Sequence, residues 1–241
     1  MSQTGTLDTL LELSLSRSHL TGCLVLSYLV RQGFPAKPEL QKRVRRLRPQ
    51  AHKELSAKAL GCVVPVDVGN YVSRSELPAS IHRADKLGVG LCTVGEGIDV
   101  SAETLRKDGR YIDAWILDTY GILVLNQLSD SLARKMWAWA STRGYRASRA
   151  YAPGVAPDGW DLSGQQCIFR LLPADRIDVH LKANLWMHPM KTRSFVIGIG
   201  THVEQADTPF SCGNCNDETC IHRRMNHEGQ STIIGESGGS Q

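Results

Sequence analysis

Apolar residues recur at helical spacing in two long stretches of the chain. Between Leu117 and Trp139 they return every three or four positions, which predicts the strongest helix of the sequence, with Gly144 placed to end it. A second stretch begins at Pro38 and predicts an amphipathic helix whose other faces carry lysine and arginine, with Pro49 as a candidate interruption. The apolar positions of this second helix are Leu40, Val44, Leu47, Ala51, Leu55 and Ala59.

Shorter apolar stretches, bounded by glycine, proline or aspartate, predict strands rather than helices. These stretches are 61–67, 89–94, 179–187 and 194–199. Ser163 and Gln166 form a capping-box pattern that predicts one more helix, through Leu172. Helices and strands are therefore interspersed, without a repeat or an internal linker, which indicates the α+β class.

The sequence predicts a single α+β domain, with a mixed or antiparallel sheet and packed helices, between two polar ends. We expect a mobile segment over 1–19, the main domain over 20–205, a cysteine-rich metal-binding loop over 206–225 and a disordered Gly/Ser-rich tail over 226–241.

Composition narrows the choice of partners. The 241 residues carry 28 Lys and Arg against 24 Asp and Glu, and a net charge of +4 is too small to predict a nucleic acid as the main partner. The longest apolar run, Leu24–Val30, is too short to span a membrane, and the N-terminus lacks a secretory signal pattern. We therefore expect a cytoplasmic protein without a nucleic-acid or membrane partner. The basic stretch Arg43–Arg48 could steer an acidic partner or simply be a solvated helix face.

Three of the seven cysteines gather in one polar segment. Cys212 and Cys215 form a Cys-x2-Cys turn that brings two thiolates to one metal, and Cys220 offers a third ligand. The fourth ligand is open: His222 would complete a zinc site, whereas a [4Fe-4S] cluster would need Cys167, an exogenous ligand or an open iron. Three unrelated surface thiols are the less favoured alternative, because exposed free thiols are reactive.

The stretch from Arg149 to Val155 is the clearest candidate for binding a small molecule. It combines a cation, an aromatic ring and a Pro-Gly corner, and Gly154 would let a ligand approach the backbone while Arg149 faces its carboxylate. The alternative is a connecting loop whose proline and glycine only set a turn.

The order of residues in and after this loop is distinctive. Arg149 is followed by Ala152-Pro153-Gly154 and then by Trp160, Leu162 and Gln165. This order resembles the S-adenosylmethionine-binding activation domain of cobalamin-dependent methionine synthase, and the stand-alone relatives of that domain are the closer match. The resemblance covers roughly 20–224 and includes the pieces 26–29, 38–40, 93–95, 116–118, 128–130, 187–189, Lys191 and 195–198.

The resemblance implies the fold of that activation domain and a site for S-adenosylmethionine. Two positions differ from the family pattern, because Val155 stands where the family usually has tyrosine and Asn126 where it usually has glutamate. Tyr151 offers a ring from another side. The implied cofactor-binding positions are Arg149, Tyr151, Ala152, Pro153, Gly154, Asp118 and Asn126.

The function implied is that of an accessory component of a corrinoid-dependent methyltransferase. The chain would bind S-adenosylmethionine and support reduction and remethylation of an inactivated corrinoid, with cobalamin held only by a partner protein and electrons supplied by a flavodoxin or ferredoxin. The usual corrinoid-binding Asp-x-His-x-x-Gly pattern is absent from the sequence. The alternative is an iron-sulfur or zinc protein for electron transfer or assembly, on the same fold, that no longer binds S-adenosylmethionine.

Overall fold

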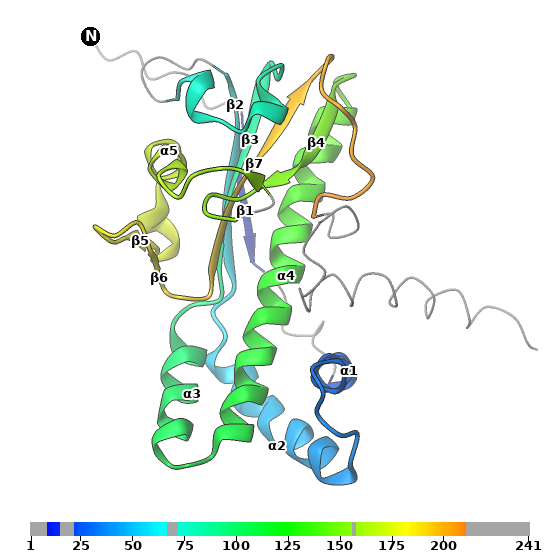
Figure 1. Ribbon diagram of the computed structural model, residues 1–241, viewed down its shortest axis with the longest axis vertical. Coiled ribbons are helices and arrows are strands. Elements are labelled where there is room, and N and C mark those ends of the chain that lie inside the picture. The colour runs from blue at the N-terminus through cyan, green and yellow to red at the C-terminus, as the bar shows by residue number, and fades with distance from the viewer. Residues whose placement is uncertain (1–8, 15–21, 67–71, 156–157, 211–241) are drawn as a thin grey trace, which may run out of the picture.

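The computed structural model describes residues 9–14, 22–66, 72–155 and 158–210. A five-stranded sheet in the order β1-β2-β3-β7-β4 forms its centre, and every pairing in the sheet is antiparallel (Figure 1). The α+β class with an antiparallel sheet is therefore confirmed. The strands are β1 (Thr9–Ser14), β2 (Lys58–Pro65), β3 (Lys86–Thr93), β4 (Arg146–Tyr151) and β7 (Thr192–Gly200), and β5 (His180–Leu181) pairs with β6 (Met187–His188) in a separate hairpin.

The central strands are buried on both faces, which explains their nearly continuous apolar sequences. Helix α4 (Tyr111–Ser141) crosses one face, where it packs on residues such as Val63 and Phe195. Helix α5 (Gly164–Leu171) covers the other face, where Cys62 and Val196 belong to a second core cluster. Figure 1 shows the two helices on opposite sides of the sheet.

Two glycines in the sheet make room for large side chains that pack on it, one from α4 and one from the neighbouring strand. A Cβ atom at Gly61 would come 2.6 Å from the terminal methyl group of Met136 on α4. A Cβ atom at Gly90 would come 2.3 Å from the ring of Phe195 on the neighbouring strand. Both positions therefore need a residue without a side chain, since the space is already filled.

Three further helices surround the first half of α4 at the end of the molecule opposite the top of the sheet (Figure 1). They are α1 (Gly22–Arg31), α2 (Pro38–Glu54) and α3 (Gly97–Lys107). The helix predicted from Pro38 is confirmed, and it continues through Pro49, which is exposed, so that the carbonyl group freed by the proline can bond water. Ala59, counted in that helix, instead belongs to β2.

An ion cluster joins α2 to α4. The carboxylate of Asp113 is 1% exposed and accepts hydrogen bonds from Arg43 at 3.1 Å, Arg46 at 2.8 Å and Arg110 at 2.7 Å. Burial alone would raise the pKa of Asp113, but the hydrogen bonds from Arg110 and Arg43 outweigh it and hold the pKa below its ordinary value.

Part of the segment expected to be mobile is a strand. Thr9–Ser14 forms β1 and pairs with β2 along its whole length, because the open edge of β2 offers backbone partners whatever the composition of the added segment. The rest of 1–19 lies outside the described residues. At the other end, the described chain continues past 205, where Pro209 accepts a 2.7 Å hydrogen bond from the backbone N–H of Ala150.

Two local predictions are wrong. The stretch 179–187 is not one strand, since Leu185 has a φ of +65°. The backbone N–H of Lys182 donates to the carbonyl of Trp186 at 2.9 Å, and this hydrogen bond closes a turn between β5 and β6. Ser163 makes no side-chain capping bond. The Asp161 carboxylate instead accepts the backbone N–H of Ser163 at 2.8 Å, two residues earlier than the predicted pattern.

Three cysteines of the described chain lie in the core. Cys62, Cys92 and Cys167 are free and buried, and burial raises the pKa of Cys62 and of Cys92 to about 12, so these two thiols stay protonated.

No helix among the described residues has the length and apolar character needed to cross a membrane.

Candidate ligand-binding site

The candidate ligand loop begins on an edge strand. Arg149 is the third residue from the end of β4, and Tyr151 is its last residue. The Arg149 guanidinium lies over the Tyr151 ring at 4.0 Å from its centroid. This stacking fixes a cation at the point where the chain leaves the sheet.

Asp158 holds the two ends of the loop together. Its carboxylate pairs with Arg149 Nη1 and accepts the backbone N–H of Ala152 at 2.8 Å. The Asp158 side chain is 8% exposed, so this ion pair is shielded from solvent on the carboxylate side. Arg149 Nη1 also donates to the carbonyl of Ala150 at 3.3 Å. Both bonds use Nη1, so that, among the residues the structure describes, Nε and Nη2 remain as donors for a ligand.

The Pro-Gly corner is fixed against the following segment. Gly154 has a φ of +77°, and its N–H donates to the carbonyl of Trp160 at 2.9 Å. A Cβ atom at Gly154 would come 2.9 Å from Leu162. The buried indole of Trp160 donates in turn to the carbonyl of Glu76 at 2.7 Å, so the loop is anchored to a distant part of the chain.

The start of α5 continues this anchoring onto β7. Gln165 Oε1 accepts the hydroxyl of Ser194 at 2.7 Å, and both side chains are buried. Nearby, Arg170 bridges Glu76 and the Cys167 thiol, each at 3.0 Å. Burial is the main cause that raises the pKa of Cys167, so its neutral thiol packs beside the ion pair rather than serving as a nucleophile.

The two predicted positions on α4 have partners of their own. Asp118 pairs with Lys191 at 2.7 Å and also with Arg106. Asn126 Oδ1 accepts a hydrogen bond from Arg193 at 2.8 Å. Within the described residues, no hydrogen bond or ion pair joins either side chain to the loop 149–155. The structure thus brings the five loop positions together and places Asp118 and Asn126 in separate contacts along the helix.

The predicted metal ligands fall outside the described residues. Cys212, Cys215, Cys220 and His222 all lie beyond residue 210. Among the described residues, no group of three or more His, Cys, Asp or Glu side chains could hold a metal ion.

Sequence reasoning missed Asp158, Lys191 and Arg193 as parts of these contacts. Asp158 stands in a Pro-Asp-Gly run, which is a turn signal that could have indicated a carboxylate bonding to nearby backbone N–H groups. Lys191 and Arg193 meet their α4 partners only through the pairing of β7 with β3, and no local signal in the sequence indicates this.

A comparison with solved structures identifies a known fold for this chain. The crystal structure of the MetH reactivation domain bound to AdoHcy is similar over 93% of this chain and 86% of that chain, with a TM-score of 0.57 and 11% sequence identity. This chain has the MetH reactivation-domain fold. The fold expected from the resemblance in the sequence is therefore confirmed. No protein-family model and no curated protein matches the chain by sequence.

Proposed function

We propose that the chain binds S-adenosylmethionine at the loop after β4 and supports remethylation of a corrinoid held by a separate protein. AdoHcy is what remains of S-adenosylmethionine after its methyl group has been donated, and a domain of the same fold binds AdoHcy. The observation that carries the proposal for this chain is the fixed cation of Arg149, which lies on Tyr151 beside the backbone corner at Gly154.

The residues of the loop would position the ligand and perform no proton transfer. The free N–H groups of Arg149 suit the ligand's carboxylate, and Asp158 holds Arg149 and the Ala152 backbone in place. The sulfonium supplies an activated methyl group, and the attacking nucleophile is the reduced cobalt of the partner's corrinoid, so no protein base is needed.

Calorimetric titration of the full chain with AdoHcy and S-adenosylmethionine tests the proposal. We expect binding, and we expect Arg149→Ala to weaken it about ten- to a hundredfold, the loss of one charge-assisted hydrogen bond. Arg143→Ala is the matched control, because Arg143 also lies over an aromatic ring, 4.3 Å from the centroid of Trp139. Absence of heat at millimolar ligand, or equal effects of the two variants, would contradict the assignment.

The same titration addresses the alternative that the fold has lost ligand binding. Arg149 is already neutralised by Asp158, and this favours a purely structural ion pair. If no ligand binds and Arg149→Ala only lowers stability, the loop is a connection and the chain serves another purpose.

For the cysteine segment we propose one metal centre on Cys212, Cys215 and Cys220, with an iron-sulfur cluster ahead of zinc because the proposed chemistry consumes electrons. Iron, sulfide and zinc analysis of anaerobically purified protein distinguishes the two. Cys215→Ser should release either metal, whereas His222→Ala should release only zinc. Finding neither metal in the parent would reduce the three cysteines to ordinary thiols.

A further inference from the structure

The end of the molecule formed by α1, α2 and the first turns of α4 exposes several large apolar side chains. Tyr111 is 69%, Trp115 50% and Ile112 44% exposed. Trp115 lies four residues after Tyr111 and three after Ile112, so it neighbours both of them on the surface of α4. Phe34 packs against Trp115 with ring centroids 5.7 Å apart. We call Phe34, Tyr111, Ile112 and Trp115 the aromatic patch.

Trp115, the central residue of the aromatic patch, is held in place before any partner arrives. The indole N–H of Trp115 donates to Gln32 Oε1 at 2.8 Å, and its ring leans on Phe34. Single exposed apolar side chains are common, but a group of four neighbouring ones is typical of an interaction site. Tyrosine and tryptophan contribute much of the energy of protein interfaces, and a preformed surface loses little entropy on binding.

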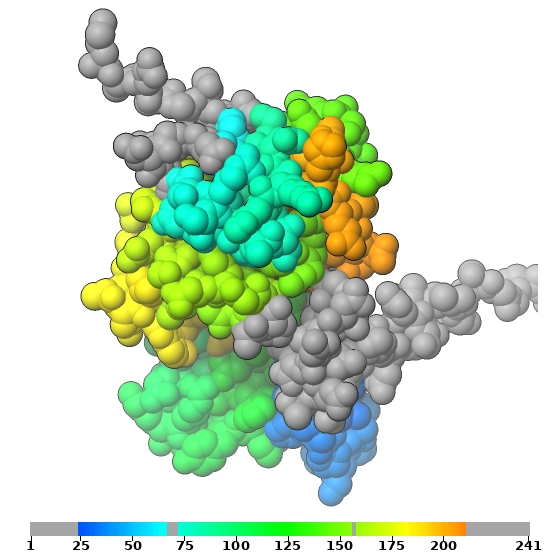
Figure 2. All heavy atoms as spheres, turned by 45° about the horizontal axis from the view of Figure 1, so that its top comes forward, coloured from blue at the N-terminus to red at the C-terminus, as the bar shows by residue number. Residues whose placement is uncertain are grey.

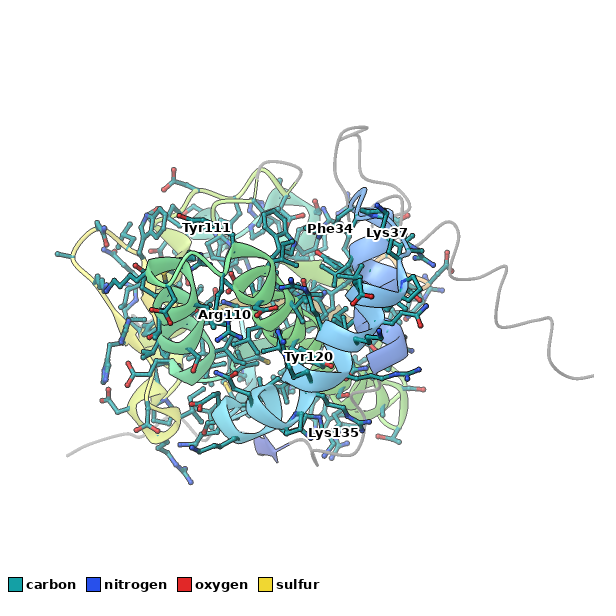
Figure 3. All side chains as sticks on the ribbon, turned by 90° about the horizontal axis from the view of Figure 1, so that it is seen from below. Phe34, Lys37, Arg110, Tyr111, Tyr120 and Lys135 are labelled. Carbon is teal, nitrogen blue, oxygen red and sulfur yellow. The ribbon has the colours of Figure 1, made fainter. Side chains whose placement is uncertain are left out.

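Cations gather at the same end of the molecule as the aromatic patch. Arg43, Arg46 and Arg110 share the single carboxylate of Asp113, so three positive charges minus one negative charge leave a net +2 at this point. The three guanidinium side chains remain 43%, 58% and 47% exposed. Figure 3 looks at this end and shows Tyr111, Phe34 and Lys37 along one edge, with Arg110 nearer the middle.

The chain between residues 31 and 48 strengthens this charge. It contains seven Lys and Arg residues and one acidic residue, Glu39. The guanidinium groups that face Asp113 are held in one orientation, and planar, oriented guanidinium groups suit bidentate binding of carboxylates.

We propose that this end of the molecule docks a partner protein whose contact surface has carboxylates beside an apolar centre. A second copy of the chain fits poorly, because two cationic surfaces would repel each other. A bilayer fits less well than a protein, since Trp115 is tied to Gln32 rather than free to insert into lipid. The proposal does not depend on ligand binding at the loop after β4.

Two synthetic helical peptides test the proposal against the full chain. Both carry the same leucine and phenylalanine face, flanked in one peptide by glutamates and in the other by lysines, and fluorescence anisotropy measures their binding. We expect the glutamate peptide alone to bind, more weakly as salt is raised. Trp115→Ala and Ile112→Ser should each weaken it at least about fivefold. Trp186→Ala is the control and should change nothing, because Trp186 is 61% exposed but lies between β5 and β6.

Three outcomes would overturn the proposal. These are absence of peptide binding, equal binding of the two peptides, and patch variants that bind as well as the Trp186→Ala control. Vesicles of phosphatidylcholine and phosphatidylserine provide the other comparison. If the parent binds these vesicles through Trp115 but binds neither peptide, the occupant is a bilayer and the docking proposal fails. Circular dichroism and thermal unfolding establish that each variant is folded.

Discussion

Gly154 is the residue on which the shape of the ligand loop most directly depends. Its φ of +77° is unfavourable for other L-residues, and an added methyl group would also meet Leu162 at 2.9 Å. The space-filling view shows the yellow-green part of the chain, which includes this loop and α5, directly against the cyan part around residue 75 (Figure 2). A substitution here should therefore affect both stability and ligand binding.

We expect Gly154→Ala to lower the free energy of unfolding by about 2 to 3 kcal/mol, the sum of backbone strain and overpacking. Gly144→Ala is a matched control, because Gly144 has a φ of +75° and no atom within 4 Å of an added Cβ. Its cost should be about 1 to 2 kcal/mol, from strain alone. Urea unfolding measures both values, and equal losses would show that Leu162 moves aside without cost.

At the scale of single residues, part of the geometry of the loop after β4 could be predicted from the sequence. The Pro-Gly corner and the adjacent cation were predictable, because glycine and proline act through their own backbone geometry. The hydrogen bond that the backbone N–H of Ala152 donates to the Asp158 carboxylate was not predicted, although the Pro-Asp-Gly turn sequence around Asp158 is a local signal. The partners of Asp118 and Asn126 could not be predicted, since Lys191 and Arg193 are more than sixty residues away along the chain.

Among the helices, the junction of α2 with α4 depends on one buried carboxylate. Asp113 has a pKa lower than in the unfolded chain, where it would be about 3.9. A lowered pKa stabilises the fold above the unfolded value, and this stabilisation is lost as the pH falls through the folded value. The contribution of Asp113 should thus be fully present at neutral pH and disappear in acid.

We expect Asp113→Asn to lower the free energy of unfolding by about 2 to 4 kcal/mol at pH 7, because three arginines lose their shared anion. The difference between variant and parent should shrink below about pH 4. Asp130→Asn on the same helix is the control: its pair with Arg134 is exposed and should contribute less than about 0.5 kcal/mol. A loss for Asp113→Asn that stays constant from pH 7 to pH 3 would contradict the electrostatic explanation.

Elements with a clear apolar period were predicted best. Helices α2 and α4 were both found, although α4 begins earlier and α2 ends earlier than expected, because the periodic stripe matches the buried stripe. Strand β4 is not predicted, because its sequence, Arg-Ala-Ser-Arg-Ala-Tyr, is short and partly polar, and its last three residues fall in the expected loop from Arg149 to Val155. Its strand conformation comes from pairing with β7, an interaction between segments about fifty residues apart.

For the whole molecule, strand order is the feature that the sequence did not predict. The last strand, β7, lies between β3 and β4, so the C-terminal part of the domain completes the core instead of extending its edge. This insertion also brings Ser194 to Gln165 and Arg193 to Asn126, which links both faces of the sheet through one strand. The resemblance predicted the fold where local periodicity could not, since it carried information about the order of segments.

The proposed function requires a second protein, and this gives a prediction for the complete system. The chain alone should not transfer the methyl group of S-adenosylmethionine to a small thiol, because the residues around Arg149 bind and position but include no base that would activate an acceptor. With a reduced corrinoid protein present, the methyl group should move to cobalt and AdoHcy should be released in equal amount. Transfer of a labelled methyl group, followed by chromatography, measures both products.

Arg149→Ala should slow the transfer, and Arg143→Ala should leave it unchanged. Methylation of the thiol by the chain alone would mean that the nucleophile is activated within this protein, and the accessory role would then be wrong.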